Sequence, residues 1–197
     1  MRLIAIEGCI GAGKTTVAQL LAKSIGAQLL LEQFGWNPFL EKFYEEPPRY
    51  ALETELSFIL IHYHQLRESL RNGIATPVVS DFCFAKDKIF CDLNLAGEEA
   101  EAFHSLYDFL TERLEQPDIV VCLHCTDDLL LDRIEKRKRD SEVATSHTYF
   151  RKLNAAYEQF FEDLLIPRID VNMSERDFLN DDKHINWLVE EIMKIMI

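Results

Sequence analysis

Residues 8–15 read GCIGAGKT and match the pattern G-x-x-x-x-G-K-[ST] at every required position. An apolar segment precedes the motif and a helical pattern follows it, which is the context in which this pattern binds phosphate. Small residues let the backbone wrap a phosphate with successive N–H groups, and the following helix adds its positive N-terminus. The sequence therefore predicts a phosphate-binding loop that holds a nucleoside triphosphate; a chance glycine-rich turn is the alternative.

The residues expected to bind the nucleotide are Gly8, Cys9, Ile10, Gly11, Ala12, Gly13, Lys14, Thr15 and Thr16. Lys14 can reach the terminal phosphates, and the Thr15 hydroxyl can join the ligands of a Mg²⁺ ion. The loop by itself does not separate kinases from GTPases, ATPases or motor proteins. The chain lacks the GTPase-type motif Asn-Lys-x-Asp, and its 197 residues are too few for added motor domains.

Short apolar segments alternate with amphipathic ones along the chain, which is typical of βαβ units around a parallel sheet. Buried strands are predicted over 2–6, 28–31, 77–80, 119–124 and 168–171. Helices are predicted over 14–25, 48–71, 98–115, 127–138, 146–164 and 182–196. We therefore expect a three-layer α/β/α fold of the P-loop NTPase type, with a five-stranded parallel sheet and residues 1–197 forming one domain.

The formal net charge is −13, which disfavours nucleic acids and anionic membranes as partners. No apolar segment approaches the roughly 20 residues of a membrane-spanning helix. The five cysteines and the absence of a signal-peptide pattern favour reduced thiols in the cytoplasm. Cys122 and Cys125 have the spacing of a zinc site, but no second pair follows, so we interpret both as core residues.

Further blocks carry a family resemblance. They are, in chain order, IEGCIGAGKTT (6–16), Glu32, NPFL (37–40), FY (43–44), Pro47, RYA (49–51), VVSD (78–81) and Arg133-x-x-x-Arg137-x-Arg139-x-x-Glu142. Together they resemble the deoxynucleoside kinase family over nearly the whole chain. The resemblance implies transfer of the γ-phosphate of ATP to the 5′-hydroxyl of a deoxynucleoside, and usually a homodimer.

Two acids follow predicted strands, at the sheet edge where open α/β folds bind ligands. Glu32 can accept the proton of an attacking hydroxyl, and the resemblance gives it that role; a solvated loop glutamate is the alternative. Asp81 can hold Mg²⁺ directly or through water. The family has an arginine after this acid, whereas this chain has Phe82. Lys86 can substitute for the missing cation, unless it is a solvated lysine paired with Asp87.

Three arginines flank the end of one predicted helix. Arg133 and Arg137 are four residues apart and share a helix face, and Arg139 follows. Converging guanidiniums stabilise the charge that phosphoryl transfer spreads over three oxygens. The family match favours a lid over residues 137–145; an ordinary basic helix end is the alternative.

The acceptor pocket is assigned mainly by resemblance. Tyr44 and Glu142 match the positions that hydrogen-bond the sugar 3′-hydroxyl; a core aromatic and a surface acid are the alternatives. Glu55 stands where the family reads the base with glutamine. An ionised carboxylate only accepts hydrogen bonds, which suits guanine, unless Glu55 pairs with a nearby cation and reads nothing. His62, with Phe58 and Gln65 on the same helix face, is a candidate to complete this pocket; a polar stripe on an exposed helix is the alternative. Phe90 is a candidate to stack on the base, and an ordinary core ring is the alternative.

The sequence thus predicts an ATP- and Mg²⁺-dependent deoxynucleoside kinase, with Glu55 suggesting a purine. Two alternatives stay open. One is another P-loop kinase that acts on a nucleoside monophosphate or a different small molecule. The other is a non-catalytic nucleotide-binding subunit of a kinase heterodimer, which the Phe82 and Glu55 departures would favour.

Overall fold

The computed structural model describes residues 3–71, 76–137 and 146–195. The strands are β1 (Leu3–Gly8), β2 (Gln28–Leu30), β3 (Val78–Ser80), β4 (Ile119–His124) and β5 (Arg168–Asn172). The helices are α1 (Lys14–Ile25), the 3-10 turn η1 (Phe34–Trp36), α2 (Leu40–Glu45), α3 (Pro47–Leu70), α4 (Lys86–Asn94), α5 (Glu98–Thr111), α6 (Asp127–Arg137), α8 (His147–Glu162) and α9 (Asp182–Ile195).

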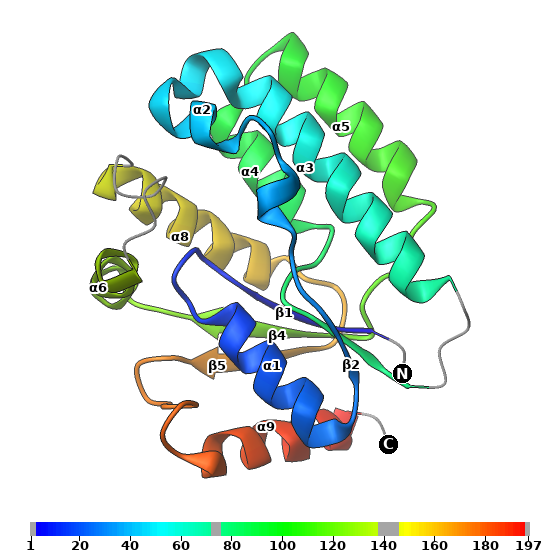
Figure 1. Ribbon diagram of the computed structural model, residues 1–197, viewed down its shortest axis with the longest axis vertical. Coiled ribbons are helices and arrows are strands. Elements are labelled where there is room, and N and C mark those ends of the chain that lie inside the picture. The colour runs from blue at the N-terminus through cyan, green and yellow to red at the C-terminus, as the bar shows by residue number, and fades with distance from the viewer. Residues whose placement is uncertain (1–2, 72–75, 138–145, 196–197) are drawn as a thin grey trace.

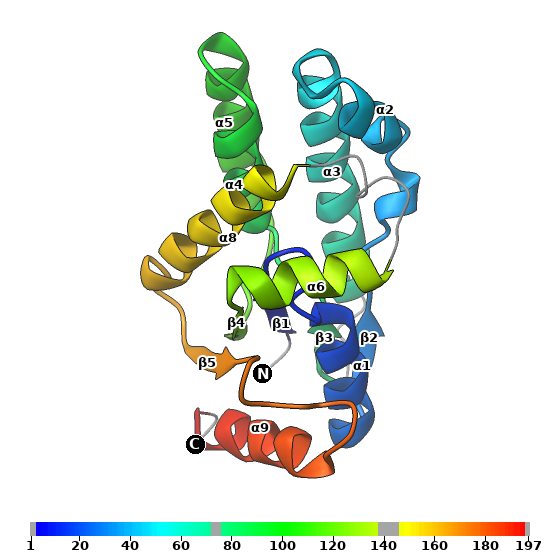
Figure 2. The same ribbon diagram turned by 90° about the vertical axis from the view of Figure 1, so that its left-hand side faces the viewer.

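The strands form one sheet in the order β2-β3-β1-β4-β5, and every neighbouring pair is parallel. Helices α1 and α9 cover one face, while α3, α4, α5 and α8 lie over the other (Figures 1 and 2). This arrangement confirms the predicted three-layer α/β/α fold with a five-stranded parallel sheet.

The central strands explain why this sheet forms. Ile4, Ala5 and Ile6 of β1 have no exposed surface, and all but the last residue of β4 are buried. Strands buried on both faces need continuous apolar runs, which is how these segments read. The prediction that 28–31 is a buried strand is wrong in one respect. β2 is an edge strand, and its Leu29 stays 36% exposed.

Helix α3 is buried along two stripes. Ile59 and Leu66 pack into the apolar cluster beneath α5, as its sequence pattern predicts. Its polar residues Glu55, His62 and Gln65 are also buried, because they face the interior rather than solvent. The alternative that His62 and Gln65 belong to an exposed polar stripe is therefore wrong.

The sequence did not predict η1, α2 or α4. Each is short, and α4 begins with two charged residues, Lys86 and Asp87, that are both buried. The C-terminal glycine predicted for the first helix is confirmed, because Gly26 adopts a φ of 65°. All five cysteines are buried and unbridged, and Cys122 and Cys125 belong to the main core, as predicted.

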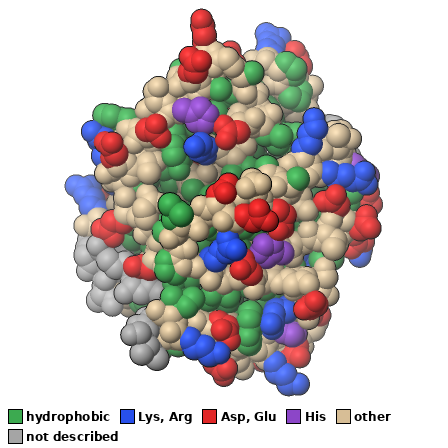
Figure 3. Space-filling model, turned by 180° about the vertical axis from the view of Figure 1, so that it is seen from behind, with side chains coloured by type: hydrophobic (Ala, Val, Ile, Leu, Met, Phe, Trp, Pro, Cys, Tyr) green, Lys and Arg blue, Asp and Glu red, His purple; other side chains and the backbone are tan. Residues whose placement is uncertain are grey.

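The surface carries its charges in a mixed pattern. On the face shown in Figure 3, acidic, basic and apolar side chains are interspersed. Among the described helices, none combines the length and the apolar character needed to cross a bilayer.

Candidate active site

A cavity of about 520 Å³ opens at the carboxyl ends of β1, β2 and β3. Parallel α/β sheets bind their ligands at this edge. The predicted site residues that line it are Ile10, Gly11, Gly13, Lys14, Thr15, Thr16, Glu32, Tyr44, Glu55, His62, Asp81, Lys86, Phe90, Arg133 and Arg137. One cavity therefore brings together side chains that are up to 127 positions apart in the sequence, from Ile10 to Arg137.

The remaining predicted residues lie elsewhere. Cys9 and Ala12 are buried in the core beneath the loop, so their side chains do not face the cavity. Gly8 also lies outside the lining, at the carboxyl end of β1. Arg139, Glu142 and the proposed lid beyond Arg137 lie outside the described residues.

The phosphate-binding loop needs glycine at two positions for different reasons. Gly13 has a φ of 103°, in the region that side-chain-bearing residues rarely adopt. A Cβ on Gly8 would lie 3.0 Å from the Cβ of Ala12 and from the carbonyl oxygen of Leu123, so the loop and β4 would have to move apart to admit it. The Lys14 ammonium donates to the carbonyls of Gly8 at 2.7 Å and Cys9 at 3.2 Å, within the loop.

Asp81, which follows β3, connects the phosphate-binding loop to the segment after β2 through two hydrogen bonds. The Thr15 hydroxyl donates to Asp81 Oδ2 at 2.6 Å, and the Glu32 N–H donates to Asp81 Oδ1 at 2.7 Å. A hydroxyl and a carboxylate are thereby held side by side at the start of α1. Both are hard oxygen ligands of the kind that Mg²⁺ prefers, so the donor set fits this ion.

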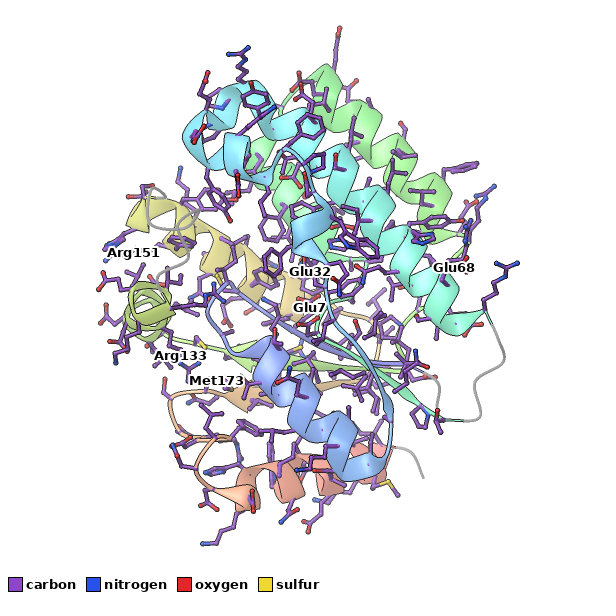
Figure 4. The ribbon with its side chains drawn as sticks, in the orientation of Figure 1. Glu7, Glu32, Glu68, Arg133, Arg151 and Met173 are labelled. Atoms are coloured by element: carbon purple, nitrogen blue, oxygen red, sulfur yellow. The ribbon has the colours of Figure 1, made fainter. Side chains whose placement is uncertain are left out.

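Glu32 lies at the centre of a buried charge cluster (Figure 4). Its Oε1 accepts from the Lys86 ammonium at 2.6 Å and contacts His62 Nε2 at 3.1 Å. The other nitrogen of His62, Nδ1, lies 2.7 Å from Asp87 Oδ1. The Glu32 carboxylate is only 18% exposed and His62 is fully buried. The alternatives of a solvated Glu32 and of a solvated Lys86 paired with Asp87 are therefore wrong.

The cluster fixes the charge states of its members. Burial would raise the pKa of Glu32, but the Lys86 ammonium and His62 outweigh it and hold this pKa well below its ordinary range. Burial would lower the pKa of His62, but Asp87 and Glu32 raise it to about 9. The pKa of Lys86 is likewise raised, against burial, by Glu32 and Glu7. Glu32 is thus an ionised carboxylate, as a proton acceptor must be.

The structure also accounts for Phe82. Its ring is fully buried, with its centroid 4.8 Å from that of the His62 ring. At the position where the family is expected to carry arginine, this chain therefore has a phenylalanine ring that packs against His62. Lys86, on the first turn of α4, supplies a cation beside Glu32 instead.

Two further residues build this centre, Glu7 and Gln65, and sequence reasoning missed the first of them. Glu7 of β1 is fully buried, and its carboxylate accepts the N–H of Cys83 at 2.5 Å, fixing the loop before α4. Burial raises the pKa of Glu7, with Lys86 and Lys14 opposing. Gln65 donates to the Leu31 carbonyl at 2.9 Å and accepts the Gln33 N–H at 3.2 Å, so it holds the chain after β2. A charged residue within an otherwise apolar central strand was the available signal for Glu7.

The far end of the cavity contains Glu55, which is 97% buried. Its Oε1 accepts from the Asn94 amide at 2.8 Å, and the same amide nitrogen lies 3.3 Å from the Tyr149 hydroxyl. Glu55 therefore contacts a neutral amide, not a cation, among the described residues. The half-buried rings of Tyr44 and Phe90 line the same cavity. Asn94 and Tyr149 were not predicted.

Arg133 reaches across the phosphate-binding loop from α6 (Figure 4). Its guanidinium donates to the Ala12 carbonyl at 2.9 Å. Arg137, the last residue of α6, also lines the cavity. Both arginines therefore line the same cavity as the phosphate-binding loop and Glu32.

The fold and the lysine-bearing loop define a P-loop nucleotide-binding protein, and three comparisons narrow this class to one family of kinases. The model of the family "Deoxynucleoside kinase" matches residues 4–197. The chain is 29% identical to deoxyguanosine kinase of Bacillus subtilis, over 98% of this chain and 97% of that protein. It is 31% identical to deoxyadenosine kinase of Dictyostelium discoideum, over 87% of this chain and 72% of that protein.

A solved structure shows the same fold. Deoxyadenosine kinase from M. mycoides with bound dCTP superposes with a TM-score of 0.83 at 23% identity, over 98% of this chain and 99% of that one. The chain therefore belongs to the deoxynucleoside kinase family. It is a kinase that takes a nucleoside triphosphate as phosphate donor, and the comparisons lend no support to the two alternative classes.

Proposed function

We propose that the protein transfers the γ-phosphoryl group of ATP to the 5′-hydroxyl of a deoxynucleoside bound in the cavity. One observation carries this proposal. The cavity has the phosphate-binding loop at one end, the hydrogen-bonded pair of Glu55 and Asn94 at the other, and the ionised carboxylate of Glu32 between them. A neutral acceptor with a hydroxyl on one side and a base on the other suits this order of groups.

The loop end would hold the triphosphate. Lys14 would exchange its two loop carbonyls for phosphate oxygens, which relieves the desolvation that now lowers its pKa. Arg133 and Arg137 would face the transferring group from α6. Thr15 and Asp81 would hold Mg²⁺, which neutralises phosphate charge when it is bound. Arg139 and Glu142 stay candidates for the same reaction, from the resemblance.

The chemistry then centres on Glu32. The 5′-hydroxyl would donate its proton to the carboxylate as its oxygen forms a bond to the γ-phosphorus. The bond from that phosphorus to the bridging oxygen breaks, and ADP leaves with the electron pair. Lys86 would hold Glu32 in place and oppose the negative charge of the reacting group, the role that the family arginine has at position 82.

We also propose a purine as the base, because the two relatives above are a deoxyguanosine kinase and a deoxyadenosine kinase. Tyr44 would contact the sugar, Phe90 would stack on the base, and Glu55 would read its edge. His62 would act indirectly, because both of its nitrogens already contact carboxylates.

The test compares acceptors and variants. Purified protein with ATP and Mg²⁺ is given each of four deoxynucleosides and their monophosphates, and the product is separated by chromatography. We expect phosphorylation of a deoxynucleoside, and a fall in kcat of about 10²-fold or more in Glu32→Gln. Glu68→Gln is the matched control, because Glu68 lies on the far end of α3 (Figure 4). Turnover of monophosphates alone, or full activity of Glu32→Gln, would refute the proposal.

Finally, we propose that residues 1–197 form one domain that acts as a homodimer in the cytoplasm. The family resemblance supports the dimer, and the exposed apolar side chains Leu60 of α3 and Phe109 of α5 offer surface for it. Analytical ultracentrifugation should give twice the chain mass of 22.9 kDa. A single species of one chain mass at assay concentrations would exclude the dimer.

A further inference from the structure

We propose that Glu55 meets the base as an uncharged carboxylic acid, and that its ionisation shifts base preference from adenine toward guanine. The inference rests on the proposed function and deepens it by assigning a specificity-determining residue. It also replaces the interpretation, made from the sequence, that Glu55 is an ionised hydrogen-bond acceptor that selects guanine.

The first argument is the geometry around the carboxyl group. Glu55 is 3% exposed, and its Oε1 accepts from Asn94 Nδ2 at 2.8 Å. Its Oε2 receives no hydrogen bond from the residues that the structure describes, although Glu55 lines the cavity. One oxygen is therefore fixed as an acceptor, and the other is left to meet a ligand. Because Glu55 lines the cavity, a bound base can supply the partner that this oxygen lacks.

The second argument is the balance of charge. The charged or titratable groups near Glu55 are His62 on its own helix, Lys86, Asp87 and Cys91 on α4, Glu32 after β2, Tyr44 on α2 and Tyr149 on α8. Lys86 is paired with Glu32 at 2.6 Å, and His62 with Asp87 at 2.7 Å. Two cations thus already match two carboxylates. Lys14, Arg133 and Arg137 line the phosphate-binding end of the same cavity. Among the described groups beside Glu55 itself, an ionised Glu55 would be a third carboxylate without a matching cation, which is strongly unfavourable in a buried site.

The upward shift in the pKa of Glu55 agrees with this balance of charge. Burial raises the pKa of Glu55 to about 8; the Asn94 hydrogen bond opposes the rise, and Asp87 adds to it. Burial raises the pKa of Cys91 to about 12, so the thiol on α4 adds no charge near neutrality. At neutral pH, Glu55 is therefore mostly protonated.

The third argument is the pattern of hydrogen-bond donors and acceptors that the protonated and the ionised forms of Glu55 present to a base. A protonated carboxyl group offers one donor and one acceptor, as an amide does. Adenine presents an amino donor beside a ring-nitrogen acceptor and pairs with both groups. An ionised carboxylate only accepts hydrogen bonds, so it can no longer donate to the ring nitrogen of adenine. It can still accept hydrogen bonds from the adjacent N–H groups of guanine.

The experiment measures kcat/KM for deoxyadenosine and deoxyguanosine from about pH 6 to about pH 9.5, a range that brackets the Glu55 pKa of about 8. The ratio of the two values is the readout, because titrations that affect the shared chemistry cancel in it. We expect the deoxyadenosine-to-deoxyguanosine ratio to fall by about tenfold or more as the pH rises, since an acceptor on the base is left unpaired.

Glu55→Gln keeps a donor and an acceptor at every pH. We expect its ratio to resemble that of the natural protein at low pH and to stay flat as the pH rises. Glu53→Gln is the matched control on the same helix, because Glu53 is exposed; its ratio should follow the natural protein.

The possible results distinguish a failure of the role of Glu55 from a failure of the proposed function. A flat ratio in the natural protein, with both deoxynucleosides phosphorylated, would overturn the role of Glu55 and leave the proposed function intact. A pH-dependent ratio that persists in Glu55→Gln would overturn it equally. Absence of phosphorylation of any deoxynucleoside would refute the proposed function, and this inference with it. If Glu55→Gln does not fold, the pH profile of the natural protein still decides.

Discussion

Replacing Lys86 by methionine tests the claim that a lysine on α4 replaces the arginine that the family has at position 82. Methionine keeps much of the length of the side chain and removes the ammonium that lies 2.6 Å from Glu32 Oε1. The Lys86 and Glu32 side chains are only 7% and 18% exposed, so water would not replace the lost contact fully. Lys86→Arg restores a cation, and Lys88→Met is the matched control, because Lys88 is exposed on the same helix.

The magnitude follows from the distance. Two unit charges 2.6 Å apart attract by about 6 kcal/mol at an effective dielectric constant of about 20. The cost of burying the charges offsets part of this, and removing one partner of a buried pair typically costs about 3–5 kcal/mol. His62 still contacts Glu32 at 3.1 Å, which favours the lower end, about 3 kcal/mol of unfolding free energy. For catalysis, losing one group aimed at the reacting charge lowers kcat by about 10²–10³-fold.

The pH profile distinguishes a catalytic effect from simple destabilisation. Lys86 holds the pKa of Glu32 below its ordinary range, so Glu32 is ionised throughout the usual assay range. Without the ammonium this pKa rises, and kcat/KM should then fall on the acid side at a higher pH than in the natural protein. Denaturant titration and initial rates at several pH values measure both effects. A Lys86→Met protein with kcat within about threefold of natural and an unmoved acid limb would refute the reasoning.

Two further predictions concern other parts of the chain. Gly13→Ala forces a φ of 103° on a residue with a side chain, which should lower the unfolding free energy by about 1–2 kcal/mol and weaken ATP binding. Thermal melting with and without ATP would show both effects, and an unchanged melting temperature would contradict the prediction. His124 lies between Glu158 at 2.6 Å and Asp170 at 2.9 Å, and these contacts raise its pKa against the effect of burial. Its stabilisation, about 1 kcal/mol or less at this partly exposed site, should therefore be present below about pH 6.5 and be lost as pH rises through the folded-state pKa. His124→Gln should remove that pH dependence of the unfolding free energy, and an identical dependence in the variant would assign it elsewhere.

The fold could be predicted from the sequence because its signals are local and repeated. Central strands β1 and β4 are continuous apolar runs, and helix α1 follows directly from the phosphate-binding loop. Helix α4 could not be predicted on the same grounds. Its sequence, KDKIFCDLN, contains few strong helix formers, and its first two residues look like solvated charges. Only the tertiary contacts of Lys86 with Glu32 and of Asp87 with His62 reveal why they are buried.

The candidate site was predicted in part for a similar reason. Motif residues such as Lys14, Glu32 and Asp81 were found, because each follows a strand or completes a known spacing. The partners of Glu55 were not, because Asn94 is 39 positions away and carries no distinguishing pattern. Its charge state depends on burial and on neighbouring carboxylates, which a residue type alone does not specify.

The central claim is that Glu32 prepares a sugar hydroxyl for attack on the phosphate held by the loop. A crystal structure with a non-hydrolysable ATP analogue, Mg²⁺ and a deoxynucleoside tests it most directly. We predict the 5′-oxygen within about 3.2 Å of a Glu32 carboxylate oxygen and in line with the γ-phosphorus. A bound deoxynucleoside whose 5′-oxygen points away from both Glu32 and the γ-phosphorus would contradict the account.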